Sequence, residues 1–129
     1  MSKKTILLTG GSGMVGRNIL EHPLAKNLNI IAPSSLELDL TDAGTTYKFF
    51  AQYKPDLVIH AAGLVGGIQA NLARPVAFLD RNIAIGRNTI MAAYESGVGS
   101  FLNLASTCMY PHAAINPLRE DMILTGELE

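Results

Sequence analysis

The stretch TILLTGGSGMVGRNIL, residues 5–20, decides the fold of this protein. Its first part, residues 5–10, is a short apolar run that ends in glycine, which predicts a buried strand. The spacing that follows predicts a helix over Met14–Glu21, and Pro23 ends it. The residues expected to face inward on this helix are Val15, Ile19 and Leu20. A strand, a glycine turn and a helix in this order predict the start of a βαβ unit.

Three glycines in this turn meet three separate demands of a bound dinucleotide. Gly10 permits the tight turn, Gly13 lets the backbone approach a pyrophosphate, and Gly16 lets the helix and strand pack closely. The phosphates would then lie against the free N–H groups and the positive end of the helix. A plain glycine-rich turn is the alternative, but the position between a strand and a helix favours dinucleotide binding.

The rest of the chain continues to alternate between strand and helix patterns. Further strands are expected at 29–33, 36–40, 56–63 and 100–106. Helices are expected from Thr41 or Asp42 to just before Pro55, and from Pro75 to Gly97. The apolar residues that recur along the second of these helices are Phe78, Leu79, Ile83, Ile90 and Tyr94. This alternation predicts a doubly wound parallel sheet, an α/β domain of Rossmann-like type.

Composition narrows the class of protein. A chain of 129 residues fits one domain, and 48% hydrophobic with 16% charged residues suits a buried parallel sheet. A net charge of −1 with scattered Lys and Arg argues against nucleic-acid binding. One cysteine excludes an internal disulfide, and no metal site is expected from the Cys and His spacing. The apolar run at 6–8 is too short for a signal peptide or membrane span, so we expect a cytoplasmic protein.

The residues after the second strand bear on cofactor choice. A carboxylate at this position would bind the ribose hydroxyls of NAD, whereas neutral donors leave room for the 2′-phosphate of NADP. Here Ser34 and Ser35 follow the strand, and no acid occurs until Glu37. This favours NADP(H), although serines are also common in loops.

Two more segments follow predicted strands, where ligands of open α/β sheets collect. In HAAGLVGG, residues 60–67, Ala61, Ala62 and Gly63 are small enough for a cofactor to lie against the backbone. Residues 65–67 either border a substrate or form a flexible glycine loop, and His60 is interpreted as a packing histidine.

The second segment is ASTCMYP, residues 105–111, which holds the only cysteine. Cys108 is either a buried thiol that packs like a small hydrophobe, or part of a catalytic pocket with Ser106 and Thr107.

Four stretches together resemble a known family of enzymes. They are TGGSGMVG at 9–16, DLTD at 39–42, HAAGLVGG at 60–67 followed by Asn71 and Pro75, and STCMYP at 106–111. The chain resembles the extended short-chain dehydrogenase/reductase superfamily and, within it, the GDP-L-fucose synthase family. That family consists of NADPH-dependent GDP-4-keto-6-deoxymannose 3,5-epimerase-4-reductases. The resemblance runs along essentially the whole chain but covers only the first part of the family's length.

The resemblance implies specific roles. Ser106 matches the serine that hydrogen-bonds the C4 carbonyl, and Cys108 matches the thiol that exchanges a proton at a neighbouring carbon. This is sensible chemistry, because a 4-ketone acidifies the hydrogens at C3 and C5. Asp39 matches an aspartate that contacts the adenine, and the alternative is a turn or cap residue. The residues implied to bind NADP(H) are Gly10, Gly11, Ser12, Gly13, Met14, Val15, Gly16, Ser34, Ser35, Asp39, Leu40, Ala61, Ala62, Gly63, Leu104, Ala105, Ser106 and Thr107.

The sequence also departs from the family. None of the four tyrosines has a lysine four residues later, so the family's Tyr-x-x-x-Lys pair is missing. We therefore expect residues 1–129 to form a partial NAD(P)-binding Rossmann domain without the substrate domain, inactive by itself and with one side of its sheet exposed. A GDP-sugar substrate and a homodimer are implied for the full-length form.

Two alternatives stay open. One is another NAD(P)-dependent nucleotide-sugar epimerase or dehydratase, against which Cys108 argues because those chemistries need no thiol there. The other is a non-catalytic NADP-binding module, which the missing Tyr-x-x-x-Lys pair favours.

Overall fold

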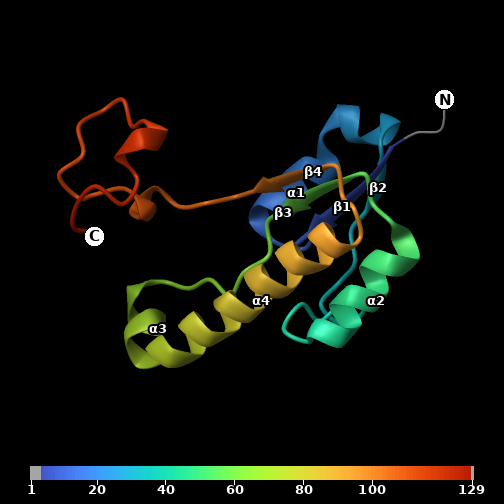
Figure 1. The fold of residues 1–129 in the computed structure, drawn as a ribbon, viewed down its shortest axis with the longest axis horizontal. Helices are drawn as coiled ribbons and strands as arrows, with labels where there is room; N and C mark the ends of the chain where they lie inside the picture. Colours follow the sequence, from blue (N-terminus) through green and yellow to red (C-terminus); the bar gives the residue numbers. More distant parts are fainter. Residues whose placement is uncertain (1–3, 129) are drawn as a thin grey trace.

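Four parallel strands form the centre of the molecule, as the computed structural model of residues 4–128 shows (Figure 1). They are β1 (Thr5–Thr9), β2 (Asn29–Ile31), β3 (Leu57–His60) and β4 (Ser100–Asn103). Their order across the sheet is β2-β1-β3-β4, and every neighbouring pair is parallel. The predicted doubly wound α/β fold is thus confirmed.

Helices cover the two faces of this sheet unequally. The helices are α1 (Met14–Glu21), α2 (Ala43–Tyr53), α3 (Ile68–Ala73) and α4 (Pro75–Glu95). Short 3₁₀ turns occur at η1 (Pro23–Asn27), η2 (Thr107–Met109) and η3 (Glu120–Met122). The chain passes from β1 to β2 in one direction and then to β3 and β4 in the other. Right-handed crossovers therefore place α1 on one face and α2 with α4 on the opposite face. No helix between residues 4 and 128 has the length and hydropathy needed to cross a membrane.

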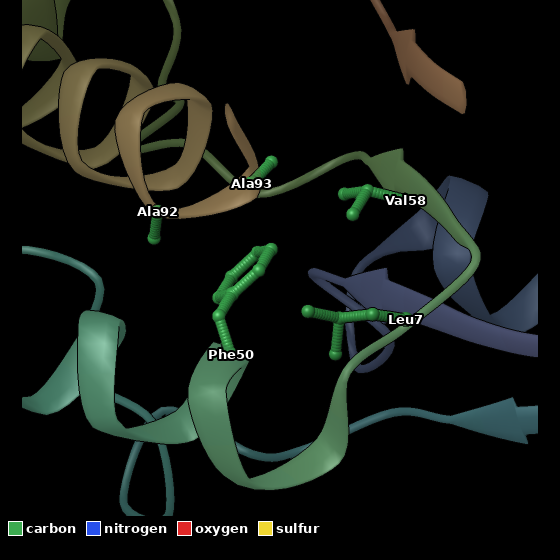
Figure 2. Close-up of a cluster of buried hydrophobic side chains, with 5 residues drawn as sticks. All are labelled: Leu7, Phe50, Val58, Ala92 and Ala93. Atoms are coloured by element: carbon green, nitrogen blue, oxygen red, sulfur yellow. The ribbon is translucent and has the colours of Figure 1, made fainter. Parts of the chain in front are cut away.

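The main hydrophobic core lies between the sheet and the α2–α4 layer. Figure 2 shows the Phe50 ring of α2 enclosed by Leu7 and Val58 from the strands and by Ala92 and Ala93 from α4. The alanines lack bulk, so α4 can approach the ring closely. Burying a phenylalanine of this kind stabilises the fold by about 1.5–3 kcal/mol.

The predicted strand at 36–40 is wrong. The backbone turns there, because the Ser34 carbonyl accepts hydrogen bonds from the N–H groups of Glu37 and Leu38. Leu38 and Leu40 are nevertheless buried, so their alternation reflects inward-facing side chains on a turn instead of a sheet ladder. No element was predicted for residues 68–73, where the structure has helix α3.

The inward face predicted for α1 is wrong, and the recurring apolar residues of α4 do not mark its buried side. On α1, Val15 and Leu20 are exposed and Ile19 is half-buried. On α4, Phe78 is buried, but the other recurring apolar residues are exposed, namely Leu79, Ile83, Ile90 and Tyr94. The residues of α4 that are buried further along are Asn88, Thr89, Ala92 and Ala93. Close approach of α4 to the sheet and to α2 requires small or hydrogen-bonding side chains, so the larger apolar residues are left outside.

Beyond β4 the chain leaves the sheet as an extended segment, drawn in orange to red in Figure 1. This segment carries η2 and η3, and it folds back on itself through a bridge between Pro111 and Leu128. Residues 111–128 are mainly loop.

Candidate dinucleotide-binding site

A cavity of about 470 Å³ lies at the carboxyl ends of the central strands. The turn after β1, the loop after β2, the loop after β3 and one side of α4 form its walls. Most residues expected to bind a cofactor line it, namely Gly10, Ser12, Gly13, Met14, Val15, Ser35, Asp39, Leu40, Ala61, Ala62 and Gly63. The position agrees with the rule that ligands of open α/β sheets bind at this edge.

The glycine turn is built as its spacing predicts. Gly10 has φ +72°, and a Cβ there would lie 2.6 Å from the carbonyl carbon of Ala61. A Cβ at Gly16 would lie 2.2 Å from the Gly10 carbonyl oxygen. By contrast, the nearest atom to a Cβ at Gly13 is 3.3 Å away. Gly10 and Gly16 are therefore required by the fold, while Gly13 keeps the cavity wall free of a side chain.

The N-terminus of α1 meets the cavity without a cap. Gly13 is the N-cap residue and offers no side-chain acceptor to the first turn. The first N–H groups of a helix have no partner within it, and they carry the positive end of the helix dipole. Met14, 79% exposed, leaves this end open. The arrangement fits a pyrophosphate, because a phosphate oxygen would satisfy these donors.

The two serines of the loop after β2, Ser34 and Ser35, lie in different environments. The Glu37 carboxylate accepts hydrogen bonds of 2.8 Å from both the N–H and the hydroxyl of Ser34. These bonds hold the pKa of Glu37 below its usual value. Ser34 is thus engaged within its own turn and does not line the cavity, whereas Ser35 does.

Asp39 lies on the cavity wall with its carboxylate partly engaged. Its Oδ1 accepts hydrogen bonds from the hydroxyl of Thr41 at 2.7 Å and from the N–H of Thr41 at 2.9 Å. These bonds lower the pKa of Asp39, and the charge of Arg81 lowers it further. Within residues 4–128, Oδ2 takes no hydrogen bond, so the ionised carboxylate keeps an acceptor for an amino group.

Two asparagines of α4 fasten the loops that form the walls. The Asn88 side chain donates to the carbonyl of Leu40 at 2.9 Å and to that of Thr41 at 3.1 Å. The Asn82 side chain accepts from the N–H of Leu64 at 2.7 Å and donates to its carbonyl at 2.9 Å. Neither asparagine was anticipated. The available signal was an amide side chain inside a long helix, where such residues are unfavourable unless they bond elsewhere.

Other residues of the cavity wall were missed as well, and they have no local pattern that could mark them. They are Thr9, Pro33, Leu38, Thr41, Leu64, Arg81 and Ile85.

His60 lies behind the cavity, at the end of β3. It is buried, and its Nδ1 is 2.7 Å from the hydroxyl of Thr9 on β1. Burial lowers the pKa of His60. This environment agrees with the interpretation of His60 as a packing residue.

Ser106 and Cys108 lie away from this cavity, on the segment beyond β4. The Ser106 hydroxyl oxygen accepts a hydrogen bond of 3.2 Å from the Cys108 N–H and so caps η2. Leu104, Ala105 and Thr107 belong to the same segment, and all five residues are exposed. The exposure of Cys108 does not fit the alternative of a buried packing thiol. Among residues 4–128, no three His, Cys, Asp or Glu side chains form a group that could hold a metal ion.

A doubly wound parallel sheet with a glycine turn and an uncapped helix at its ligand-binding edge defines a Rossmann-like α/β domain. The chain belongs to the NAD dependent epimerase/dehydratase family, whose model matches residues 6–129.

Named relatives place the chain more closely. It is 51% identical over 124 residues to the GDP-L-colitose synthase of Yersinia pseudotuberculosis, which covers 96% of this chain and 40% of the relative. It is 45% identical over 126 residues to the GDP-L-fucose synthase of Azorhizobium caulinodans, and this match covers 98% of this chain and 40% of that relative. The chain therefore spans about two fifths of the length of these relatives.

Solved structures of related reductases have the same fold as this chain. The GDP-mannoheptose C4 reductase from Campylobacter jejuni, solved with NADP bound, superposes with a TM-score of 0.88 at 32% identity. The match covers 100% of this chain and 41% of that one.

Proposed function

We propose that the cavity binds NADP(H), and that the chain is the cofactor-binding part of a GDP-sugar epimerase/reductase of the GDP-L-fucose synthase type. The observation that carries the proposal is the uncapped N-terminus of α1, which opens beside Gly13 onto the cavity. The names of the relatives support the substrate class, and the NADP bound to the Campylobacter reductase supports the cofactor.

The chain's own residues would divide the binding between them. The first N–H groups of α1 hold the pyrophosphate, and Oδ2 of Asp39 accepts from the adenine amino group. Ser35 faces the side where a 2′-phosphate would lie, and Ser34 can join it only by giving up its bond to Glu37. When bound, NADPH supplies a hydride.

Ser106 and Cys108 are proposed as the catalytic residues for epimerisation. The Ser106 oxygen uses a lone pair to accept from the Cys108 N–H, so its own proton remains available to donate to a C4 carbonyl. Cys108 is the chain's only thiol and would move a proton at the carbon beside that carbonyl. Reduction additionally needs a proton donor such as the Tyr-x-x-x-Lys pair. Because these 129 residues do not contain that pair, we expect them to bind the cofactor without turnover.

Binding can be tested by calorimetric titration of the chain with NADPH. Gly13→Val should abolish binding, because its side chain would occupy the space next to the helix N-terminus. Gly67→Ala serves as a control, since a Cβ there meets no atom within 4 Å and Gly67 does not line the cavity. Unchanged NADPH affinity in Gly13→Val would refute the proposal.

The role of Cys108 requires a protein in which the chain is joined to the remaining three fifths of a relative. Cys108→Ser raises the pKa of the side chain far above that of a thiol and leaves a poor acid and base. This variant should still oxidise NADPH with an already epimerised keto-sugar but should incorporate little solvent deuterium at C3 and C5 of the other epimer. Deuterium exchange at the unaltered rate would show that Cys108 is not catalytic.

The same protein separates the alternatives. Cofactor binding without NADPH oxidation or deuterium exchange would favour the non-catalytic NADP-binding module. The position of Ser106 and Cys108 outside the cavity is consistent with that alternative.

The homodimer expected of the full-length form also remains a proposal, and sedimentation of the same joined protein would test it.

A further inference from the structure

Arg81 is the one cationic side chain on the wall of the cavity, as far as residues 4–128 are concerned. It projects from α4, one turn before Ile85, which also lines the cavity. Asp39 is the other charged residue that the described part of the chain places on this wall. A negative ligand in this cavity therefore meets one fixed negative charge and one fixed positive charge.

The guanidinium of Arg81 is not used by the protein itself. In the part of the chain that the structure describes, the ion pair between side chains joins Arg119 and Asp121, and Arg81 makes no hydrogen bond. Its charge nevertheless acts on Asp39, so the guanidinium lies near that carboxylate without pairing with it. A guanidinium offers several N–H donors in a rigid fork that matches the oxygens of a phosphate.

The position of Arg81 selects one part of a dinucleotide. The next residue, Asn82, is bonded to Leu64 in the loop after β3. Arg81 thus lies between that loop and the Asp39 turn. Ser35, the residue best placed for a 2′-phosphate, follows β2, which β1 separates from β3 in the sheet. Because a dinucleotide of this fold places its pyrophosphate beside β1 and its ribose phosphate beside β2, the strand order favours the pyrophosphate as the group that Arg81 meets.

We propose that Arg81 binds the pyrophosphate of the dinucleotide, together with the N–H groups at the start of α1 on the wall of the same cavity. This inference rests on the proposed function of the cavity. Arg81 supplies the counter-charge that backbone donors alone cannot provide, and it offsets the repulsion between the phosphates and Asp39. The role belongs to the pyrophosphate common to NADPH and NADH.

The test compares Arg81→Gln with Arg87→Gln, using calorimetric titration with NADPH and with NADH at two salt concentrations. Arg87 is exposed on the same helix and does not line the cavity, so its variant controls for the loss of a positive charge on α4. Arg81→Gln should weaken both dinucleotides by the same factor, at least about tenfold, because a charge-assisted hydrogen bond is lost. Arg81→Lys should recover part of the affinity as a point charge, and Arg81→Gln should reduce the salt dependence of binding.

Each other outcome is decisive. A loss confined to NADPH would overturn the assignment, because it would place Arg81 at the 2′-phosphate. Equal affinities of Arg81→Gln and Arg87→Gln would also overturn it. If the unaltered chain binds neither dinucleotide, the proposed function fails together with this inference. If the unaltered chain binds both dinucleotides and Arg81→Gln leaves both affinities unchanged, this inference fails while the proposed function stands.

Discussion

Gly16 and Gly86 are both helical glycines, but their surroundings differ in a way that can be measured. A Cβ at Gly16 would lie 2.2 Å from the Gly10 carbonyl oxygen and 2.6 Å from the Gly11 Cα, both backbone atoms that cannot move aside cheaply. Gly86 lies within α4, and a Cβ there meets no atom within 4 Å.

Gly16→Ala should therefore lower the free energy of unfolding by about 1–3 kcal/mol through overpacking. Gly86→Ala should raise it by about 0.5–1 kcal/mol, because alanine favours the helix more than glycine does. Urea unfolding monitored by circular dichroism measures both values. Effects of the same sign in the two variants would contradict the packing role assigned to Gly16.

His60 makes the stability of the fold depend on pH. Burial lowers the pKa of His60 in the folded chain, whereas the unfolded chain keeps a value of about 6.5. Above that pH both states are neutral and the stability is fully present. Below it the unfolded state binds more protons, so stability is lost as the pH falls.

The free energy of unfolding should therefore decrease between pH 7.5 and pH 5.5, measured with urea. In His60→Gln this contribution to the decrease should vanish, while His22→Gln, which replaces an exposed histidine, should keep it. An unaltered pH slope in His60→Gln would argue that burial does not control this group.

At the scale of elements, side chains of α4 hold two loops of the candidate site in place. Its buried Asn88 bonds two carbonyls of the loop that carries Asp39, and its Asn82 bonds the loop after β3. The helix therefore acts as a rigid support for two loops that have no ladder of their own. Asn88 is a positioning residue because it does not itself line the cavity.

Asn88→Ala should leave the carbonyls of Leu40 and Thr41 without this donor, at a cost of about 1–3 kcal/mol of stability. NADPH should also bind more weakly, since the turn that presents Asp39 is no longer held. Asn18→Ala, at an exposed position of α1, is the matched control and should change stability by less than about 0.5 kcal/mol. NADPH affinity equal in the two variants would remove the positioning role.

At the scale of the whole molecule, the two faces of the sheet are not equally covered. Phe101 packs against the core on the α2–α4 side, while its neighbour Leu102 points to the α1 side and is 52% exposed. Helix α1 connects β1 to β2, so it covers that half of its face and leaves β3 and β4 more open. This agrees with the expectation that one side of the sheet is exposed.

The open part of this face, over β3 and β4, should cause the chain to self-associate at high concentration, because a contiguous exposed apolar surface favours association. Leu102→Lys should reduce this association in sedimentation velocity without changing the far-ultraviolet circular dichroism spectrum. Lys48→Leu, which adds an apolar residue to α2, should not reduce it. If Leu102→Lys associates as strongly as the unaltered chain, the contact surface lies elsewhere.

The sequence by itself determined the architecture and the glycine turn. Residues 5–20 contain a strand, a turn and a helix whose glycine positions are set by local backbone geometry, as the positive φ of Gly10 shows. The order of strands and helices then determined a parallel sheet, since crossover handedness leaves few alternatives. Cavity residues such as Ala61 and Gly63 could be predicted because they directly follow a strand, whereas Asp39 was indicated only by the family resemblance.

Only the tertiary structure decided which side chains of each helix and turn are buried against other elements. Leu38 and Leu40 alternate like a strand yet lie on a turn, and the larger apolar side chains of α4 are exposed while Asn88 is buried. Periodicity reports the spacing of side chains along one element, but burial depends on distant elements that pack against it. For the same reason, only the folded chain brings Arg81 beside Asp39 and leaves Cys108 outside the cavity.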